Sequence, residues 1–206
     1  MALDADIDVP EQAQGVVLFA HGSGSSRHSP RNRYVADELQ RGGLGTVLVD
    51  LLTREEEELD QRTAELRFDI GLLASRVIAL TDWMVEHEPT AGLRIGLFGA
   101  STGAAAALAA AAQQPGPVMA VVSRGGRPDL AGGFLPAVRQ PVLLITGQRD
   151  EVVIDLNRQA LARLQGEADL VIVPGATHLF SEPGTLEQVA ELARDWFVHH
   201  LTRATP

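Results

Sequence analysis

The chain has 206 residues, of which 45% are hydrophobic and none is cysteine, and its formal net charge is −10 at pH 7. This composition is typical of one globular domain, and it excludes disulfides, thiolate metal sites and a cysteine nucleophile. The acidic balance argues against electrostatic binding of nucleic acid and against docking on anionic membranes. Because residues 1–14 lack a signal-peptide pattern and no apolar run of about 18 residues occurs, we expect a cytoplasmic protein.

Short apolar runs alternate with helical patterns along the chain, which predicts an α/β fold with a mostly parallel sheet between two layers of helices. The runs are rich in Val, Leu and Ile, as strands buried on both faces are. The predicted strands are 16–20, 46–50, 93–98, 118–123, 142–146 and 170–173. We expect residues 1–14 to be a poorly ordered N-terminal extension and residues 15–206 to form a single domain.

Between the predicted strands lie amphipathic and alanine-rich patterns that indicate helices. A long amphipathic helix is expected to end near Pro89, and an alanine-rich helix is expected to pack closely under the sheet. The last helix is expected to begin at Thr185, with Gln188 three residues later completing a capping box. The patterns before this last helix span 66–84, 104–112 and 153–164. The glutamates at 55–58 favour the start of a helix over a metal site.

The segment Gly99-Ala100-Ser101-Thr102-Gly103 joins a predicted strand to the alanine-rich helix. A serine at a sharp strand-to-helix turn is lifted clear of the sheet and has backbone N–H groups beside it. Glycines two residues before and two after it let neighbouring segments approach without a Cβ clash. This G-x-S-x-G pattern, the nucleophile elbow, makes Ser101 a candidate nucleophile.

A nucleophilic serine needs a base, and the base needs an orienting acid. His178 follows the last predicted strand, and Asp150 follows the strand before it. Loops beyond the carboxyl ends of parallel strands lie along one edge of the sheet, so these side chains are candidates for one site. Their chain order, serine, aspartate and histidine, is the order in α/β-hydrolases. Asp129, which follows the strand at 118–123, is the alternative acid.

Four segments together resemble a small serine member of the dienelactone hydrolase-like group within the α/β-hydrolase superfamily. They are Phe19–Gly24, the serine elbow, Gly147–Asp150 and Gly175–Phe180, and they spread the resemblance over roughly residues 15–201. The resemblance implies a three-layer α/β/α sandwich with Ser101 as nucleophile, His178 as base and Asp150 as orienting acid. It also implies hydrolysis of esters or lactones through an acyl-enzyme, without a cofactor or a metal ion.

Two departures from that group affect what the resemblance implies. The better-known dienelactone hydrolases use a cysteine nucleophile, so the lactone substrate is not carried over to Ser101. The first two strands of the superfamily, an antiparallel hairpin, have no counterpart in the short segment before Val16, so we expect about six strands. Only 18 residues, 123–140, separate two strands where larger relatives insert a lid. We therefore expect no lid domain and an open site suited to small esters or a shallow polymer-like substrate.

The anion formed when a serine attacks a carbonyl needs hydrogen-bond donors already in place. We expect one donor to be the backbone N–H of Thr102, at the start of the elbow helix. The other should come from the loop after the first strand, with the N–H of Ser23 preferred over that of Gly24. The side chain of His21 in this loop is interpreted as structural, because His178 already occupies the position of the base.

Two other functions remain as alternatives. Gly22-x-Gly24 after a strand resembles a dinucleotide-binding loop, and Asp50 could then hold a ribose, but Arg27 occupies the position of the third glycine. A hydrolase-fold binding protein with vestigial catalysis is the second alternative, and the presence of all three triad residue types argues against it.

Arginines near the same edge of the sheet are candidates for substrate binding. Arg124 and Arg127 follow a predicted strand, where their guanidinium groups could bind a substrate carboxylate or phosphate through forked hydrogen bonds. A salt bridge that holds their loop is the competing explanation, and Arg31 and Arg33 are interpreted as surface charges. The expected partner is a small ester or lactone rather than nucleic acid or a membrane, and monomer and homodimer are both open.

Overall fold

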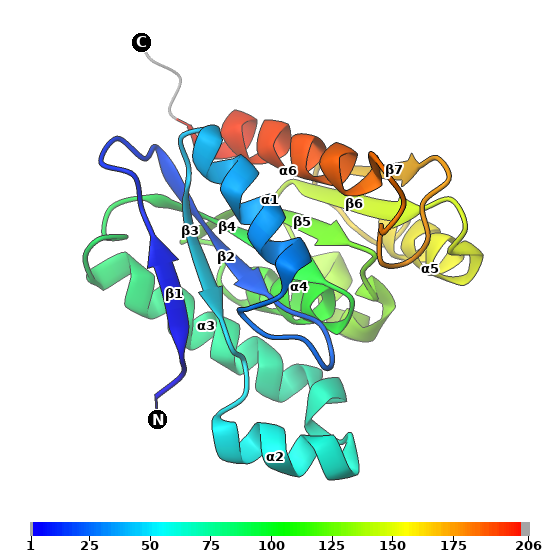
Figure 1. Ribbon diagram of the computed structural model, residues 1–206, viewed down its shortest axis with the longest axis horizontal. Coiled ribbons are helices and arrows are strands. Elements are labelled where there is room, and N and C mark those ends of the chain that lie inside the picture. Colours follow the sequence, from blue (N-terminus) through cyan, green and yellow to red (C-terminus); the bar gives the residue numbers. More distant parts are fainter. Residues whose placement is uncertain (1, 203–206) are drawn as a thin grey trace.

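The computed structural model describes residues 2–202, in which a seven-stranded sheet lies between two layers of helices (Figure 1). The strand order is β1-β3-β2-β4-β5-β6-β7, with β1 antiparallel to β3 and all other neighbours parallel. The strands are Ala5–Asp8 (β1), Gly15–Ala20 (β2), Gly45–Val49 (β3), Arg94–Ala100 (β4), Val118–Arg124 (β5), Val142–Gly147 (β6) and Ala168–Val173 (β7). The predicted α/β sandwich with a mostly parallel sheet is confirmed, with one strand more than expected.

The additional strand is β1, and the expectation that nothing before Val16 belongs to the sheet is wrong. Residues 5–8 pair antiparallel with β3, Ala5 opposite Val49 and Asp8 opposite Thr46. The prediction failed because this edge strand alternates charged and apolar residues over only four positions, whereas the central strands are continuously apolar. One of its two carboxylates has partners, since Asp6 forms ion pairs with Arg33 and Arg27.

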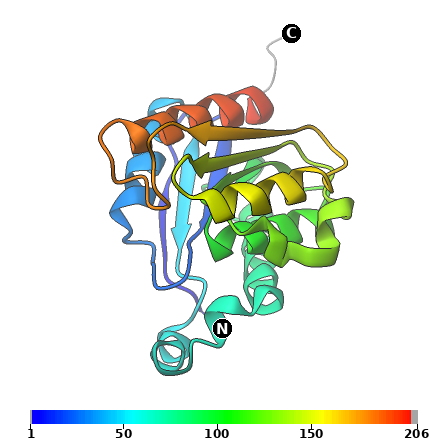
Figure 2. The same cartoon turned by 90° about the vertical axis from the view of Figure 1, so that its right-hand side faces the viewer.

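Helices cover both faces of the sheet, and Figure 2 shows the sheet between them. One face is covered by α1 (Pro30–Arg41) and α6 (Thr185–Leu201). The other is covered by α3 (Ile70–Glu86), α4 (Thr102–Gln113), α5 (Glu151–Leu161) and the kinked 3₁₀ stretch η2 (Pro128–Ala137). Helix α2 (Arg54–Thr63) and the short η1 (Leu66–Phe68) follow β3 and project beyond the sheet (Figure 1). No helix within residues 2–202 is both long enough and apolar enough to cross a lipid bilayer.

The alanine-rich helix α4 packs closely against the sheet, as its small side chains predicted. Its residues 102–111 are all buried. A Cβ at Gly103 would collide with the backbone oxygen of Ala20 on β2, and one at Gly99 would collide with the backbone of Ala104. The two outer glycines of the elbow are therefore required by the close approach of α4 to β2 and β4.

Two details of the predicted helices are wrong. The apolar pattern that begins at Leu66 is interrupted, because Asp69 caps a new helix by accepting a hydrogen bond from the N–H of Leu72 at 2.9 Å. Helix α6 begins at Thr185 as expected, but its N-cap residue is Gly184 and no capping box forms. The Thr185 hydroxyl instead donates to the carbonyl of Glu182 at 2.7 Å.

A buried ion pair ties α2 to the segment that follows it. Asp60 is only 1% exposed, and it accepts hydrogen bonds from the Arg67 backbone N–H at 2.9 Å and from Arg67 Nε at 2.6 Å. Burial by itself raises the pKa of Asp60, but the hydrogen bonds and charge of Arg67 outweigh it and hold that pKa below its ordinary value. Both residues line a small cavity together with Gly22–Gly24 and Thr102, so the pair lies next to the predicted oxyanion loop.

We predict that Asp60→Asn lowers the free energy of unfolding at pH 7 by about 2–3 kcal/mol, because it weakens charge-assisted hydrogen bonds inside the protein. Since the pKa of Asp60 is lowered by folding, its stabilisation is complete above the pKa of the unfolded chain and disappears as the pH falls through the folded value. Urea unfolding of the wild type and of Asp60→Asn across the acid range should therefore show that the difference between their free energies of unfolding shrinks as the pH falls.

Asp155→Asn, which removes an exposed pair with Arg158, is the control and should lower the free energy of unfolding by less than about 0.5 kcal/mol. Equal losses in the two variants would contradict the prediction.

Candidate active site

Ser101 lies at the turn between β4 and α4, in the strand–turn–helix setting that its motif requires. Its φ of 50° and ψ of −120° place a non-glycine residue in a sparsely populated region of backbone conformation. The turn is held on both sides, because the Ser101 N–H donates to the carbonyl of Arg124 at 3.3 Å and its carbonyl accepts from the N–H of Arg127 at 3.0 Å. The end of β5 and the loop after it therefore fix the position of this serine.

Asp150 and His178 form a hydrogen bond between Oδ2 and Nδ1 at 2.6 Å. Asp150 follows β6 and His178 follows β7, and the parallel pairing of these strands brings their two loops together. Asp150 is also the N-cap residue of α5, yet its side chain makes no capping bond and turns to the histidine instead. With Nδ1 bound to the carboxylate, Nε2 of His178 is the nitrogen left to accept a proton.

Gly125 connects the serine turn to the histidine. A Cβ at Gly125, whose φ is 50°, would lie 3.5 Å from both Nδ1 and Cε1 of His178, so the imidazole packs against this glycine. The residue before it, Arg124, binds the amide of Ser101. One short segment thus contacts both Ser101 and His178. These two residues do not hydrogen-bond to each other in the part of the chain described, and in unliganded enzymes such bonds are often long.

The histidine loop is braced by residues that the sequence analysis did not single out. Glu182 accepts a hydrogen bond from the N–H of Thr177 at 3.0 Å, and this bond lowers the pKa of Glu182. Gln148 accepts one from the N–H of Gly175 at 2.8 Å, which joins the loops after β6 and β7. The only sequence signal for these two residues is a polar side chain in or near a loop. Such side chains are too common in loops to identify a bracing residue.

The loop after β2 lies directly against the serine. A Cβ at Gly22 would stand 2.8 Å from the Cβ of Ser101, and the hydroxyls of Ser23 and Thr102 are hydrogen-bonded at 3.1 Å. The N–H of Thr102 lies in the first turn of α4, where no carbonyl of the helix can accept it. The N–H of Ser23 makes no hydrogen bond within residues 2–202. Both backbone groups predicted as oxyanion donors are therefore close to Ser101 and not engaged elsewhere.

His21 is buried, and each of its ring nitrogens has a partner. Nε2 accepts a hydrogen bond from the N–H of Leu51 at 3.1 Å, and Nδ1 donates to the carbonyl of Gly22 at 2.9 Å. These bonds connect the β2 loop to the segment after β3. The geometry agrees with the interpretation of His21 as a structural residue.

The two arginines proposed for substrate binding, Arg127 and Arg124, differ in their ion-pair partners and in their burial. Arg127 forms a forked pair with Asp129, through Nε to Oδ1 at 2.9 Å and Nη2 to Oδ2 at 2.8 Å. This pair fits the salt bridge considered as the competing explanation, and it keeps Asp129 within its own loop, away from His178. Arg124 is buried, with 8% of its surface exposed, and its side chain makes no hydrogen bond or ion pair with any described residue.

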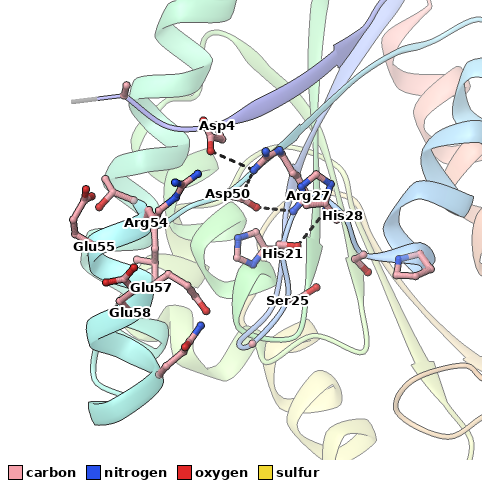
Figure 3. Close-up of a pocket in the computed structure, with 18 of the residues that line it drawn as sticks. Asp4, His21, Ser25, Arg27, His28, Asp50, Arg54, Glu55, Glu57 and Glu58 are labelled. Atoms are coloured by element: carbon pink, nitrogen blue, oxygen red, sulfur yellow. Dashed lines mark hydrogen bonds and ion pairs between the residues drawn. The ribbon is translucent and has the colours of Figure 1, made fainter.

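A large open hollow of about 1340 Å³ lies beyond the carboxyl ends of β2 and β3, between the loop after β2 and the start of α2 (Figure 3). Its wall contains Arg27, which binds both Asp4 and Asp50. Because the carboxylate of Asp50 is already bound by Arg27, the nucleotide-binding alternative loses its candidate ribose acceptor. Arg31, interpreted as a surface charge, also lines the hollow; its exposure is intermediate, and its Nε is buried without a hydrogen bond.

Comparisons with known proteins agree with this fold. A sequence model of the Dienelactone hydrolase family matches residues 3–201. The crystal structure of a dienelactone hydrolase from Anabaena variabilis is 60% identical, with a TM-score of 0.95 over 97% of this chain and 92% of that one. An α/β serine hydrolase without a lid from Xanthomonas campestris is 25% identical, with a TM-score of 0.75 over 99% of this chain and 91% of that one.

A curated relative carries a different kind of name. The Mycobacterium tuberculosis protein called "Putative phosphoribosyl transferase" is 59% identical over 200 residues, which are 97% of this chain and 44% of that protein. The chain thus spans less than half the length of this relative. The family match covers nearly the whole chain, including the serine elbow and the loops of Asp150 and His178. The chain therefore belongs to the dienelactone hydrolase family.

Proposed function

We propose that this protein is a serine hydrolase that cleaves carboxylic esters or lactones through an acyl-enzyme at Ser101. The observation that carries the proposal is the 2.6 Å hydrogen bond between Asp150 and His178, at the edge of the sheet where the serine elbow also lies. Membership of a hydrolase family supports hydrolysis. The proposal goes further in assigning the nucleophile to Ser101. A cysteine nucleophile is not available, because the chain contains no cysteine.

In the proposed reaction, Nε2 of His178 takes the proton of the Ser101 hydroxyl as Oγ attacks the carbonyl carbon. The carbonyl oxygen becomes an anion that accepts hydrogen bonds from the backbone N–H groups of Thr102 and Ser23. When the tetrahedral intermediate collapses, the bond to the alcohol breaks and the imidazolium gives its proton to the leaving oxygen. Asp150 stabilises the imidazolium and holds its tautomer.

The second half of the reaction repeats these steps with water. His178 takes a proton from the water as its oxygen attacks the acyl carbon, and the same two N–H groups stabilise the anion. Collapse breaks the bond to Ser101 Oγ, which recovers its proton from His178, and the carboxylic acid leaves. We propose a small-molecule substrate, which the hydrolase family supports. The 125–141 segment carries only η2 where a lid would be inserted, so we expect the site to be open.

Phosphoribosyl transfer is not proposed for this chain. More than half of the relative that bears this name lies outside the matched region. The matched region is the one that carries the serine elbow and the Asp150–His178 pair. A binding protein with vestigial catalysis is also disfavoured. Without catalysis there is no functional reason for the mostly buried carboxylate of Asp150 to hold the half-exposed imidazole of His178.

The proposal is tested with a fluorophosphonate probe, which reacts with activated serines whatever their substrate. We expect one probe adduct in the intact mass of the protein, and peptide mapping should place it on Ser101. Parallel assays with p-nitrophenyl esters of short acids should detect turnover. An adduct on another residue, or ester turnover in a protein that the probe neither labels nor inhibits, would contradict the assignment of Ser101.

A further inference from the structure

Arg124 ends β5 on the face of the sheet that α1 and α6 cover. Val122, two residues earlier, belongs to the apolar cluster beneath these helices. Because side chains alternate along a strand, Arg124 lies on the same face as Val122, one step nearer the carboxyl edge of the sheet. Arg124 therefore lies at the end of the apolar cluster that is nearest the carboxyl edge of the sheet, the edge where Ser101 and His178 also lie.

Arg31, on α1, lies toward the same end of this apolar cluster. It precedes Val35 by one helical turn, and Val35 belongs to the same apolar cluster as Val122. Arg31 thus also extends this cluster toward the carboxyl edge. Burial first and the charge of Arg31 second lower the pKa of Arg124 to about 10.

Neither guanidinium has a partner for its charge among residues 2–202. Nη1 of Arg124 and Nε of Arg31 are buried without a hydrogen bond, and so is Oδ1 of Asn32, a side chain that is 2% exposed. Other inward-facing arginines do have carboxylate partners, for example Arg67 with Asp60 and Arg76 with Glu56. A buried cation without a partner, such as Arg124, is costly, so an anion bound between it and the partly exposed Arg31 would be favoured.

We propose that Arg124 and Arg31 form a subsite for a phosphate-sized dianion that is part of the ester substrate. Charge decides the class of anion, because a phosphate monoester carries about −1.5 to −2 at pH 7 and matches two guanidinium groups, whereas one carboxylate leaves a positive charge unpaired. In the first turn of α1, Pro30 has no N–H and the N–H of Asn32 donates to the Ser29 hydroxyl, so the backbone adds only the N–H of Arg31 to the subsite.

The position of the subsite fits a substrate of the proposed hydrolase, on which this inference rests. The carbonyl of Arg124 binds the amide of Ser101, so the cation and the nucleophile stand on adjoining strand ends. Arg31 also lines the large hollow beside the β2 loop. Arg127, occupied by Asp129, is left out of the subsite.

The first test measures binding without catalysis. Thermal unfolding of the wild type and of Arg124→Met is followed with inorganic phosphate or acetate at equal ionic strength. Phosphate at 100 times its Kd should shift the wild-type folding equilibrium about 100-fold toward the native state, and acetate should shift it far less. Arg124→Met should melt higher than wild type without phosphate, because it removes an unpaired buried charge, and should not respond to phosphate. Arg158→Gln, which removes an exposed arginine, should respond as the wild type does.

The second test uses three aryl esters that differ only at the far end of the acyl chain, which carries a phosphate monoester, a carboxylate or a methyl ether. Wild-type kcat/KM should be highest for the phosphate ester. In Arg124→Met and in Arg31→Gln, the ratio of kcat/KM for the phosphate ester to that for the methyl ether should fall about 10- to 100-fold, the effect of losing charged hydrogen bonds. Arg158→Gln should keep the wild-type ratio.

The outcomes separate the subsite from the hydrolase. If Arg124→Met melts lower than wild type and still responds to phosphate, Arg124 is structural and the subsite is overturned. Preference for the carboxylate ester, or phosphate stabilisation without any preference among the esters, would overturn the assignment to a substrate dianion. If the methyl ether is cleaved at Ser101 but phosphate is neither bound nor preferred, the subsite fails and the hydrolase stands. Arg124-dependent phosphate binding in a protein that cleaves no ester would refute the hydrolase and keep the anion site.

Discussion

Ser101→Ala is expected to lower kcat for ester hydrolysis by about 10⁴- to 10⁶-fold while the fold is kept, because the variant lacks the atom that attacks the carbonyl. The strained turn should persist, since the backbone N–H and carbonyl of residue 101 keep their bonds to the β5 loop whatever the side chain. Residual activity above the uncatalysed rate would come from the oxyanion donors and from binding. Steady-state kinetics with p-nitrophenyl esters measures the effect.

The matched control is Ser75→Ala, which removes an exposed hydroxyl on α3 that bonds only to the carbonyl of Leu72. It should retain wild-type activity and probe labelling, whereas Ser101→Ala should lose both. Turnover by Ser101→Ala within tenfold of the wild type would mean that another group attacks the substrate.

Asp150→Asn is expected to lower kcat by about 10⁴-fold, and Asp129→Asn by less than about tenfold. An amide in place of Asp150 keeps the shape of the 2.6 Å contact but cannot stabilise the imidazolium or hold the catalytic tautomer of His178. Asp129 instead accepts a forked pair from Arg127, and an asparagine oxygen can still accept part of it. The measurement is steady-state kinetics on both variants, with circular dichroism to show that each is folded.

The opposite pattern would assign the acid to Asp129, with Ser101 and His178 unaffected. Comparable loss in both variants would indicate that the loop after β5, which contacts Ser101 and His178, depends on the Arg127–Asp129 pair for its shape. In that case Arg127→Gln should lose activity to the same extent as Asp129→Asn.

The edge strand β1 illustrates where sequence patterns stop being informative. The five inner strands could be predicted because strands buried on both faces need nearly continuous apolar residues. The edge strand β7 was predicted as well, since Leu170–Val173 is also an apolar run. A four-residue edge strand that alternates aspartate with alanine or isoleucine carries no such requirement. Its pairing with β3 depends on a partner about 40 positions away, so only the folded chain defines it.

In the candidate site, too, some features follow from the local sequence and others only from the folded chain. By itself, the sequence determined the serine elbow, because strand, turn glycines and helix are adjacent along the chain, and it placed Asp150 and His178 at strand ends. The tertiary structure decided which carboxylate meets His178, since Asp150 and Asp129 both follow strands and differ only in their neighbours. It also separated two arginines three positions apart, pairing Arg127 with Asp129 and burying Arg124 without a partner among residues 2–202. Local patterns encode burial and turns, whereas the partner of a charged side chain depends on segments brought together by strand pairing and helix packing.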